Sequence, residues 1–256
     1  MPKVYCYTFP ERLEKTTRIL TAFARGCGGE LVHDGVIRED GIAVVWGQVW
    51  DSARIMKECA EKGIDFFQID NGYFLAARGR HEGYFRVTKN GQVQNTIIDR
   101  PDDRFCKLGI RIKPYKKDGT NIALCVPGLN FGRFAGIDLE RWTDETQAVI
   151  RLNTKKKLYI RDKMKNPPLD EYLEGVNAFA VVTHSSNAAV EALIEGYAVF
   201  CDKECAAAPA ANLDLTQLDN PVYFDRFKWA YSLAYAQFTM EEMEGGIAWN
   251  VIKRDL

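Results

Sequence analysis

The stretch 179–201 constrains the fold more than any other part of this sequence. Its apolar run 179–182 predicts a buried strand, and the polar residues 183–187 that follow predict a turn. Good helix formers at 188–195 predict a short helix ended by a glycine, and the apolar run 197–201 predicts a return to the sheet. A strand, a helix and a second strand in this order form the βαβ unit of a parallel sheet.

The turn 183–187 carries the first indication of a ligand site. It reads Thr-His-Ser-Ser-Asn, so small hydroxyl and amide side chains stand at the opening of a helix, beyond the carboxyl end of a strand. Free N–H groups and the helix dipole favour an anion there, and open α/β sheets bind ligands at that edge. Serine and asparagine are also good helix caps, so an ordinary capped helix explains the same residues.

Strands and helices alternate along most of the remaining chain. Apolar runs predict strands at 3–8, 41–47, 64–69, 121–127 and 158–160. Helical spacing predicts helices at 11–27, 53–62, 139–151, 227–237 and 240–253. Alternating residues around Asn90-Gly91 predict a hairpin over 84–95.

This alternation predicts an α/β protein with two Rossmann-like parallel-sheet halves facing a cleft. The polar, turn-rich stretch 105–120 predicts the linker between them. We therefore expect an N-terminal domain 1–115 and a C-terminal domain 116–256, with the last helix able to pack back on the first domain.

Composition limits the class of protein. Of 256 residues, 46% are hydrophobic and 27% charged, which is typical of a soluble globular protein. Seven cysteines without a Cys-x-x-Cys pair and only three histidines predict neither a structural zinc site nor a disulfide scaffold. With no leader-like start and no apolar run of about 18 residues, we expect a cytoplasmic protein that does not use a membrane. The oligomeric state stays open.

Charge gives a weaker indication of partners. The net charge of −1 does not predict nucleic-acid binding. Two stretches, 113–117 and 155–165, are nevertheless basic. Solvated loops explain most such runs, and a surface that faces phosphate is the alternative.

The motif at 184–187, His-Ser-Ser-Asn, is followed by Val190-Glu-Ala-Leu193, a glycine and an apolar strand. Together these residues resemble the donor-binding strand and helix of GT-B glycosyltransferases of the capsule-polysaccharide type. Patterns within 47–91 and 233–249 resemble a phage-borne set of proteins assigned as glycosyltransferases. The resemblance therefore covers most of the chain.

The resemblance implies roles for particular residues. The helix start would hold the diphosphate of a nucleotide-sugar, and Glu191 would contact the ribose. A basic residue after the strand 158–160 would contact donor phosphate, where many of these enzymes have Arg-Pro-Lys and this chain has Arg-Asp-Lys. The donor-binding residues that we predict are Gly128, Arg133, Arg161, Lys163, His184, Ser185, Ser186, Asn187 and Glu191. For His184 a hydrogen-bonded structural role is the alternative.

The first half would hold the acceptor and the general base. Asp70 ends a predicted strand, so its carboxylate could take a proton from an attacking hydroxyl, and a turn that closes the strand is its alternative role. Asp51 is the second candidate base, and a helix cap is its alternative role.

These observations predict a glycosyltransferase that moves a sugar from a nucleotide-sugar to an acceptor hydroxyl. The nucleotide-sugar is a co-substrate, with a UDP-sugar expected first, and no cofactor is required. The chain has no Asp-x-Asp motif, so we expect metal-independent transfer with no bound metal. A hydroxymethylated pyrimidine in phage duplex DNA is the first acceptor to test. A nucleotide-sugar epimerase of the same fold and a non-catalytic nucleotide-binding module are the alternatives.

Overall fold

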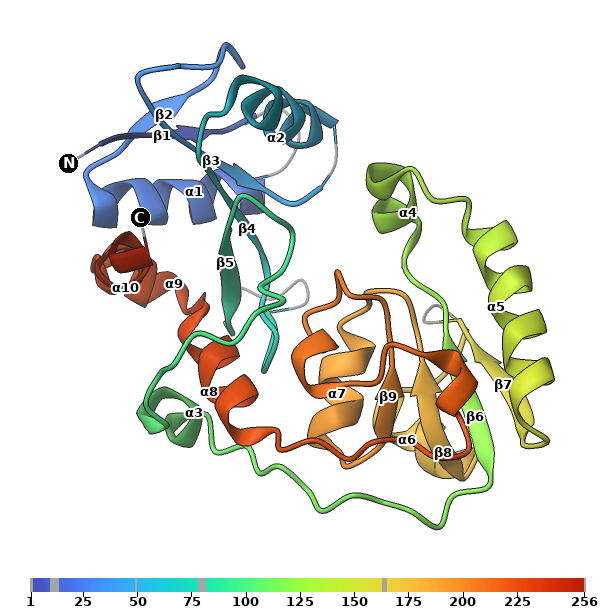
Figure 1. Ribbon diagram of the computed structural model, residues 1–256. Coiled ribbons are helices and arrows are strands. Elements are labelled where there is room, and N and C mark those ends of the chain that lie inside the picture. The colour runs from blue at the N-terminus through green and yellow to red at the C-terminus, as the bar shows by residue number, and fades with distance from the viewer. Residues whose placement is uncertain (1, 10–13, 49, 78–81, 163–164, 256) are drawn as a thin grey trace. The chain divides into compact units, whose positions relative to one another are not determined.

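The computed structural model describes the chain except for residues 1, 10–13, 49, 78–81, 163–164 and 256. Contacts within the chain divide it into two compact units. Unit 1 comprises Met1–Gln94 and Leu233–Leu256, and unit 2 comprises Asn95–Ser232. The sequence placed a single boundary at 115/116, whereas these contacts divide the chain at 94/95 and again at 232/233. Both units are of the α/β class with mostly parallel sheets, which confirms the predicted fold class (Figure 1).

The sheet of unit 1, among the residues that are described, has six strands in the order β10-β5-β4-β3-β1-β2. Neighbours among β1 to β4 are parallel, and β5 and β10 add antiparallel pairs at one end. The strands are β1 (Lys3–Tyr7), β2 (Glu30–Val32), β3 (Gly41–Trp46), β4 (Phe66–Asn71), β5 (Phe85–Lys89) and β10 (Gln237–Phe238).

Helices cover this sheet on both faces. The helices of unit 1 are α1 (Glu14–Cys27), α2 (Trp50–Lys62), α9 (Met240–Glu244) and α10 (Ile247–Ile252), followed by a 3₁₀ turn η3 (Lys253–Asp255). One core joins α1, α9 and α10 to the sheet, with the indole of Trp249 edge-on to Phe23 and Phe67. The helix predicted at 240–253 is interrupted, because Gly246 has a φ of 77°. A side chain at Gly26 would come within 1.8 Å of the Met243 carbonyl, so glycine permits α1 to contact α9.

The predicted hairpin at 84–95 is wrong. Residues 91–95 form no strand, and β5 instead pairs antiparallel with β4, which precedes it in the chain. Asn90 has a φ of 51°, and its side chain accepts a hydrogen bond from the Phe66 amide. The Asn-Gly pair therefore ends β5 and does not join two adjacent strands.

Unit 2 contains a four-stranded, fully parallel sheet in the order β7-β6-β8-β9, counted over the described residues. Its strands are β6 (Asn121–Cys125), β7 (Lys157–Arg161), β8 (Ala178–Val182) and β9 (Ala198–Phe200). The helices are α3 (Asp103–Lys107), α4 (Leu129–Ala135), α5 (Leu139–Asn153), α6 (Leu169–Gly175) and α7 (Ala188–Ile194), with 3₁₀ turns η1 (Ala208–Ala210) and η2 (Leu215–Gln217). α8 (Phe227–Tyr235) crosses from unit 2 to unit 1.

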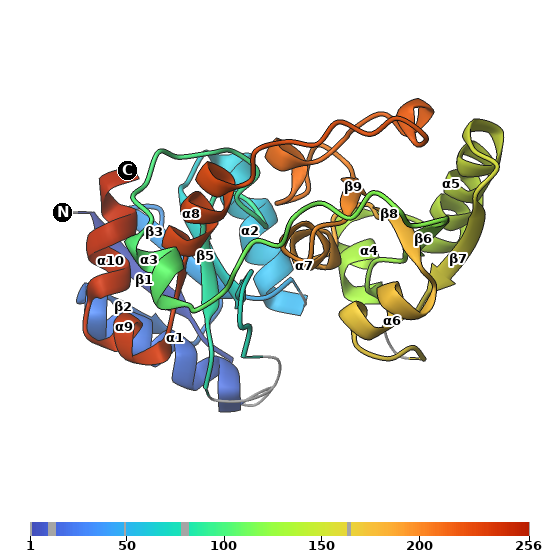
Figure 2. The same cartoon turned by 90° about the horizontal axis from the view of Figure 1, so that it is seen from below.

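The layers of unit 2 place several loops at one edge. α5 lies on one face of the sheet, and α6 and α7 lie on the other (Figure 2). The predicted loop 128–136 is largely a helix, α4, that directly follows β6. Because all the strands are parallel, the loops after β6, β7, β8 and β9 emerge at the same carboxyl edge.

No helix in the described part of the chain is both long enough and apolar enough to cross a bilayer.

Candidate functional site

The order of strands in unit 2 creates a switch point between β6 and β8. The chain runs from β6 to β7 on one side and then to β8 on the other side of β6. The loops after β6 and β8 therefore diverge, which is where open α/β sheets bind ligands. The hydroxyl of Thr183 donates to the Cys125 carbonyl at 2.6 Å and ties the two strand ends together. Gly128 and the residues 184–187 lie directly beyond these ends.

His184 is held by aromatic neighbours at this edge. The centroid of its ring lies 5.4 Å from that of Phe131 and 5.9 Å from that of Trp142. Its Nδ1 is 3.2 Å from the Ser185 hydroxyl oxygen. The side chain is half-buried, so the ring is positioned by packing and still reaches the surface. Both roles considered for His184, structural and ligand-binding, are compatible with this placement.

The start of α7 already satisfies some of its own N–H groups. The Ala188 amide donates to Ser186 Oγ at 3.2 Å, and the Ala189 amide donates to the Ser186 carbonyl at 3.0 Å. The side chain of Asn187 contacts Glu191 Oε1 at 3.4 Å. α7 is also a short helix, ending at Ile194. Its dipole is therefore a weak attractor for an anion, and an anion here needs a further cation.

The position of Arg161 makes it the candidate for this further cation. It is the last residue of β7 and pairs in register with Cys125 at the end of β6. Only 8% of the residue is exposed, and its guanidinium carbon lies 5.8 Å from the ring centroid of Tyr172. Nη2 donates to the Pro167 carbonyl at 2.8 Å, and Nε has no partner among the described residues. A buried cation without a counter-ion is costly, so this arrangement favours an anionic ligand.

Three other predicted donor residues have less definite surroundings. Gly128 precedes α4, and a side chain built there would meet nothing within 4 Å, so the backbone is open to a ligand. Arg133 is exposed in the last turn of α4. Lys163 lies outside the described residues. The structure therefore gathers Gly128, Arg161 and residues 184–187 at one edge.

Asp70 and Asp51 both belong to unit 1, at the carboxyl edge of its sheet. Asp70 lies within β4, where its Oδ1 accepts from the amide of the next residue, Asn71, at 2.7 Å and its Oδ2 accepts from Arg86 Nη2 at 3.0 Å. The side chain of Asp70 keeps 21% exposure. Asp51 lies inside the first turn of α2, which begins at Trp50, and 4.0 Å from Arg54 Nε. It is therefore not the residue before the helix, as the cap alternative required.

Sequence reasoning missed two basic residues beside Asp70. Arg86, only 9% exposed, is its ion-pair partner, and Nε of this arginine has no partner among the described residues. Lys15 Nζ lies 5.4 Å from the ring centroid of Trp46 and 5.5 Å from that of Phe85. Burial lowers the pKa of Lys15, and the charge of Asp70 opposes this shift. The available signal was Arg86 itself, a charged residue between the core residues Phe85 and Val87 of a strand.

Part of the positive charge of the two basic stretches is neutralised within unit 2. Lys113 pairs with Glu195, Lys116 with Glu174, and Lys156 with Asp219. Exposed pairs of this kind leave less positive potential for phosphate than the sequence suggests.

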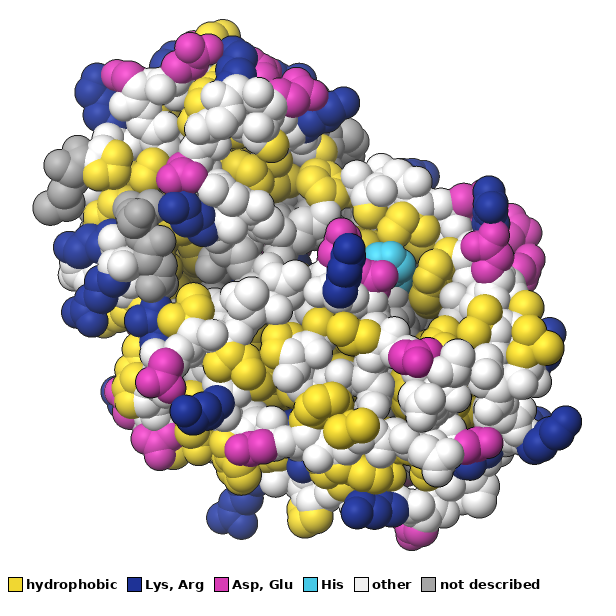
Figure 3. All heavy atoms as spheres, in the orientation of Figure 1, with side chains coloured by type: hydrophobic (Ala, Val, Ile, Leu, Met, Phe, Trp, Pro, Cys, Tyr) yellow, Lys and Arg dark blue, Asp and Glu magenta, His cyan; other side chains and the backbone are white. Residues whose placement is uncertain are grey.

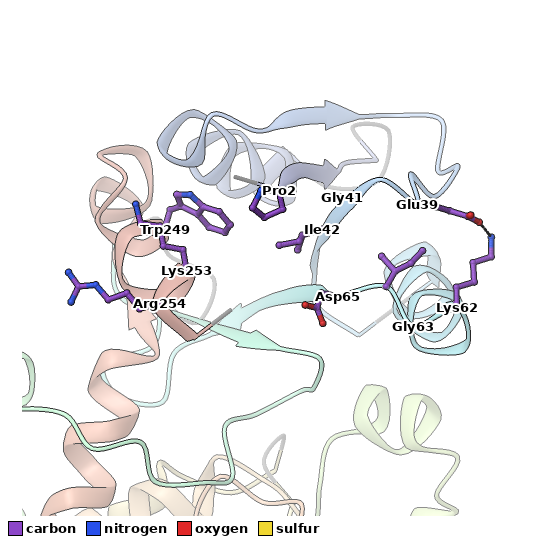
Figure 4. A pocket seen from close by; sticks show the side chains of 11 residues that line it. Pro2, Glu39, Gly41, Ile42, Lys62, Gly63, Asp65, Trp249, Lys253 and Arg254 are labelled. Carbon is purple, nitrogen blue, oxygen red and sulfur yellow. Dashed lines mark hydrogen bonds and ion pairs between the residues drawn. The ribbon is translucent and has the colours of Figure 1, made fainter.

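The described residues also line a cavity of about 1020 Å³ in unit 1, at the opposite, amino-terminal edge of its sheet (Figure 4). Its wall includes Trp249, Lys253 and the Lys62–Glu39 ion pair, whose atoms lie 2.7 Å apart. None of the predicted site residues lines it. Ligands of parallel sheets bind at the carboxyl edge, so we do not assign the reaction to this cavity. Within the described chain no three His, Cys, Asp or Glu residues are grouped to hold a metal ion.

Comparison with known proteins bears on the fold. No protein-family profile and no curated protein matches the chain. Among solved structures, the β-Kdo 2,4 transferase of Thermosulfurimonas dismutans KpsC matches with a TM-score of 0.57 and 12% identity, over 98% of both chains. The β-Kdo 2,7 transferase of the same protein matches with a TM-score of 0.54 and 12% identity, over 99% of this chain and all of that one. The chain shares the fold of these transferases. At 12% identity the likeness concerns the fold alone; it confirms the expectation of a glycosyltransferase fold.

Proposed function

We propose that this protein is a glycosyltransferase that binds a nucleotide-sugar at the carboxyl edge of the unit 2 sheet. One observation carries the proposal: the buried Arg161, at the end of β7, has no carboxylate partner among the described residues. A phosphate group supplies the negative charge that this guanidinium lacks, and arginine binds phosphate through charge-assisted hydrogen bonds. The fold shared with two Kdo transferases supports the same reaction class.

The chemistry requires stabilisation of a leaving group. The bond between the anomeric carbon and the phosphate oxygen breaks, and negative charge develops on the departing nucleotide. Arg161 and the hydroxyls of Ser185 and Ser186 are fixed donors for that charge, and Glu191 holds the ribose. Each prepositioned hydrogen-bond donor of this type lowers the activation free energy of the reaction, by about 2.7–4 kcal/mol for one donor to an oxyanion.

The other half of the reaction activates the acceptor. Its hydroxyl oxygen forms the new bond to the anomeric carbon and loses a proton, which Asp70 accepts. Each carboxylate oxygen accepts more than one hydrogen bond, so the contacts with Asn71 and Arg86 leave capacity for a substrate hydroxyl. Asp51 is the second candidate for this role.

Binding of the donor is tested first. A thermal-shift screen with UDP-, GDP-, CMP- and ADP-sugars identifies the nucleotide, since a ligand at about 100 times its Kd stabilises the folded state by about 2.7 kcal/mol. Arg161→Ala should weaken that donor by about 1.5–3 kcal/mol in calorimetry. Arg151→Ala, on the exposed end of α5, is the matched control and should bind normally. Equal donor affinity in wild type and a folded Arg161→Ala would remove the main support for this function.

Turnover separates the alternatives. A transferase releases free nucleotide only as the sugar reaches an acceptor, an epimerase returns an altered nucleotide-sugar, and a binding module shows stoichiometric binding without turnover.

The acceptor remains a hydroxyl of unassigned chemistry, and hydroxymethylated pyrimidines in duplex DNA stay our first expectation. A base must leave the helix to react, at a cost of a few kcal/mol. Electrophoretic shifts with plain and hydroxymethylated duplexes at about 50 mM salt test this, because phosphate contacts weaken steeply with salt. No shift with either duplex would redirect the search to saccharide or small-molecule acceptors.

A further inference from the structure

Three aromatic rings meet at the carboxyl edge of the unit 2 sheet and have no role in the steps above. Phe131 lies in α4, Trp142 lies in the first turns of α5, and the ring of His184 contacts both. All three residues are half-buried. By contrast, core aromatics of unit 2 such as Phe200 and Trp229 are each 1% exposed. The three rings are thus placed at the surface of the site.

The backbone around these rings is well fixed. The Asp138 carboxylate caps α5 by accepting from the amides of Glu140 and Arg141, both at 3.1 Å. A side chain at Gly132 would come within 2.7 Å of Leu139, so α4 contacts the start of α5 closely. Figure 3 shows hydrophobic side chains beside the histidine over α4, and a mixture of hydrophobic and charged side chains over α5. These contacts support the backbone that carries Phe131 and Trp142, and a backbone ordered before binding lowers the entropic cost of binding.

The chemistry of these rings favours the nucleobase of a nucleotide-sugar over its sugar as their ligand. Phenylalanine forms no conventional hydrogen bond, and tryptophan donates one but accepts none. Phe131 and Trp142 can therefore bind a sugar only by packing on the C–H face of its ring, and they leave its several hydroxyls without partners. A nucleobase is flat on both faces and stacks on aromatic side chains. His184 also leads directly to Ser185, which is the start of the proposed phosphate site.

We propose that Phe131 and Trp142, with His184 between them, form the subsite for the nucleobase of the donor. The inference rests on the proposed function and extends it by assigning the base to the α4–α5 side of the sheet edge. The phosphate and ribose then lie toward Arg161 and α7.

Fluorescence and calorimetry test this with UMP, CMP, GMP and AMP, and with glucose 1-phosphate as a probe that lacks a base. At least one nucleotide should change the tryptophan fluorescence of the wild type, and glucose 1-phosphate should not. Trp142→Phe keeps an aromatic ring, so it should retain binding and lose the optical change, although four of the five tryptophans remain. Phe131→Ala and Trp142→Ala should each bind that nucleotide about 5- to 150-fold more weakly, because one stacked base contributes about 1–3 kcal/mol.

Phe227→Ala is the matched control, since Phe227 is 52% exposed in the same unit and lies outside the cluster. It should bind nucleotide as the wild type does. Unchanged nucleotide affinity in folded Phe131→Ala and Trp142→Ala would overturn the subsite and leave the proposed function standing. A fluorescence change caused by glucose 1-phosphate and lost in Trp142→Phe would assign the rings to the sugar instead. Failure of the wild type to bind any nucleotide or nucleotide-sugar would contradict both the proposed function and the nucleobase subsite.

Discussion

Asp70 and Arg86 face each other on neighbouring antiparallel strands, with the carboxylate Oδ2 3.0 Å from the guanidinium Nη2. Their side chains are 21% and 11% exposed, so the pair is partly shielded from water. This pairing orients the carboxylate that we assign as the base. It also places a cation beside any acceptor that reaches Asp70.

Asp70→Asn should lower the rate of sugar transfer by about 10²- to 10⁴-fold, because the side-chain amide can keep the contact with the Asn71 N–H but cannot accept a proton. Donor affinity should be little changed, since the donor is assigned to unit 2. Initial rates with saturating donor measure the effect, and Asp51→Asn is the paired variant. A normal rate for Asp70→Asn beside a collapse for Asp51→Asn would reverse the assignment.

A double-mutant cycle on Asp70 and Arg86 should reveal coupling. Arg86→Gln leaves a partly buried carboxylate without its cation. The substitution should therefore lower the free energy of unfolding more in the wild type than in the Asp70→Asn variant. We expect a coupling of about 0.5–3 kcal/mol in urea unfolding. Additive effects would show that the contact contributes nothing measurable to stability. The exposed pair Lys3–Asp40 is a control, expected at no more than about 1 kcal/mol.

Transfer should continue after treatment with EDTA. The leaving nucleotide is expected to be stabilised by Arg161 and hydroxyls, so removing divalent ions removes no required group. The assay compares rates before and after chelation, followed by addition of Mg²⁺ or Mn²⁺. Loss of activity that either ion restores would mean that a metal supplies the charge assigned here to the protein.

Thiol labelling of the native protein should discriminate between two cysteines of unit 2. Burial raises the pKa of Cys125 to about 12, whereas Cys106 is exposed. At pH 8 a group with that pKa is about 1 part in 10⁴ thiolate, and only the thiolate reacts. With Ellman's reagent, Cys106→Ser should remove a fast-reacting thiol and Cys125→Ser should not. Labelling of Cys125 at the rate of an exposed thiol would show that the end of β6 opens in solution.

Local sequence patterns were sufficient to predict the positions of most strands and of the helices between them. The predicted strand 179–182 and helix 188–195 correspond to β8 and α7 within one residue at each end. Both are specified by neighbouring residues, through apolar periodicity and a terminating glycine. The edge location of Arg161 and His184 follows from the same patterns, since each lies within two residues of the end of a predicted strand.

Contacts between distant segments could not be derived in this way. The Asn-Gly pair predicted a hairpin, yet β5 pairs with β4 and then with β10, which lies far along the chain. The rings of Phe131, Trp142 and His184, and the ion pair of Asp70 with Arg86, depend on how helices and strands pack. Such contacts depend on close packing and burial across the whole unit, which no local periodicity encodes. The α/β class and the sheet edge where we predict the ligand site could be derived from local sequence patterns. Only the packing of distant segments determines which side chains meet at that edge and which of the described polar atoms there have no partner.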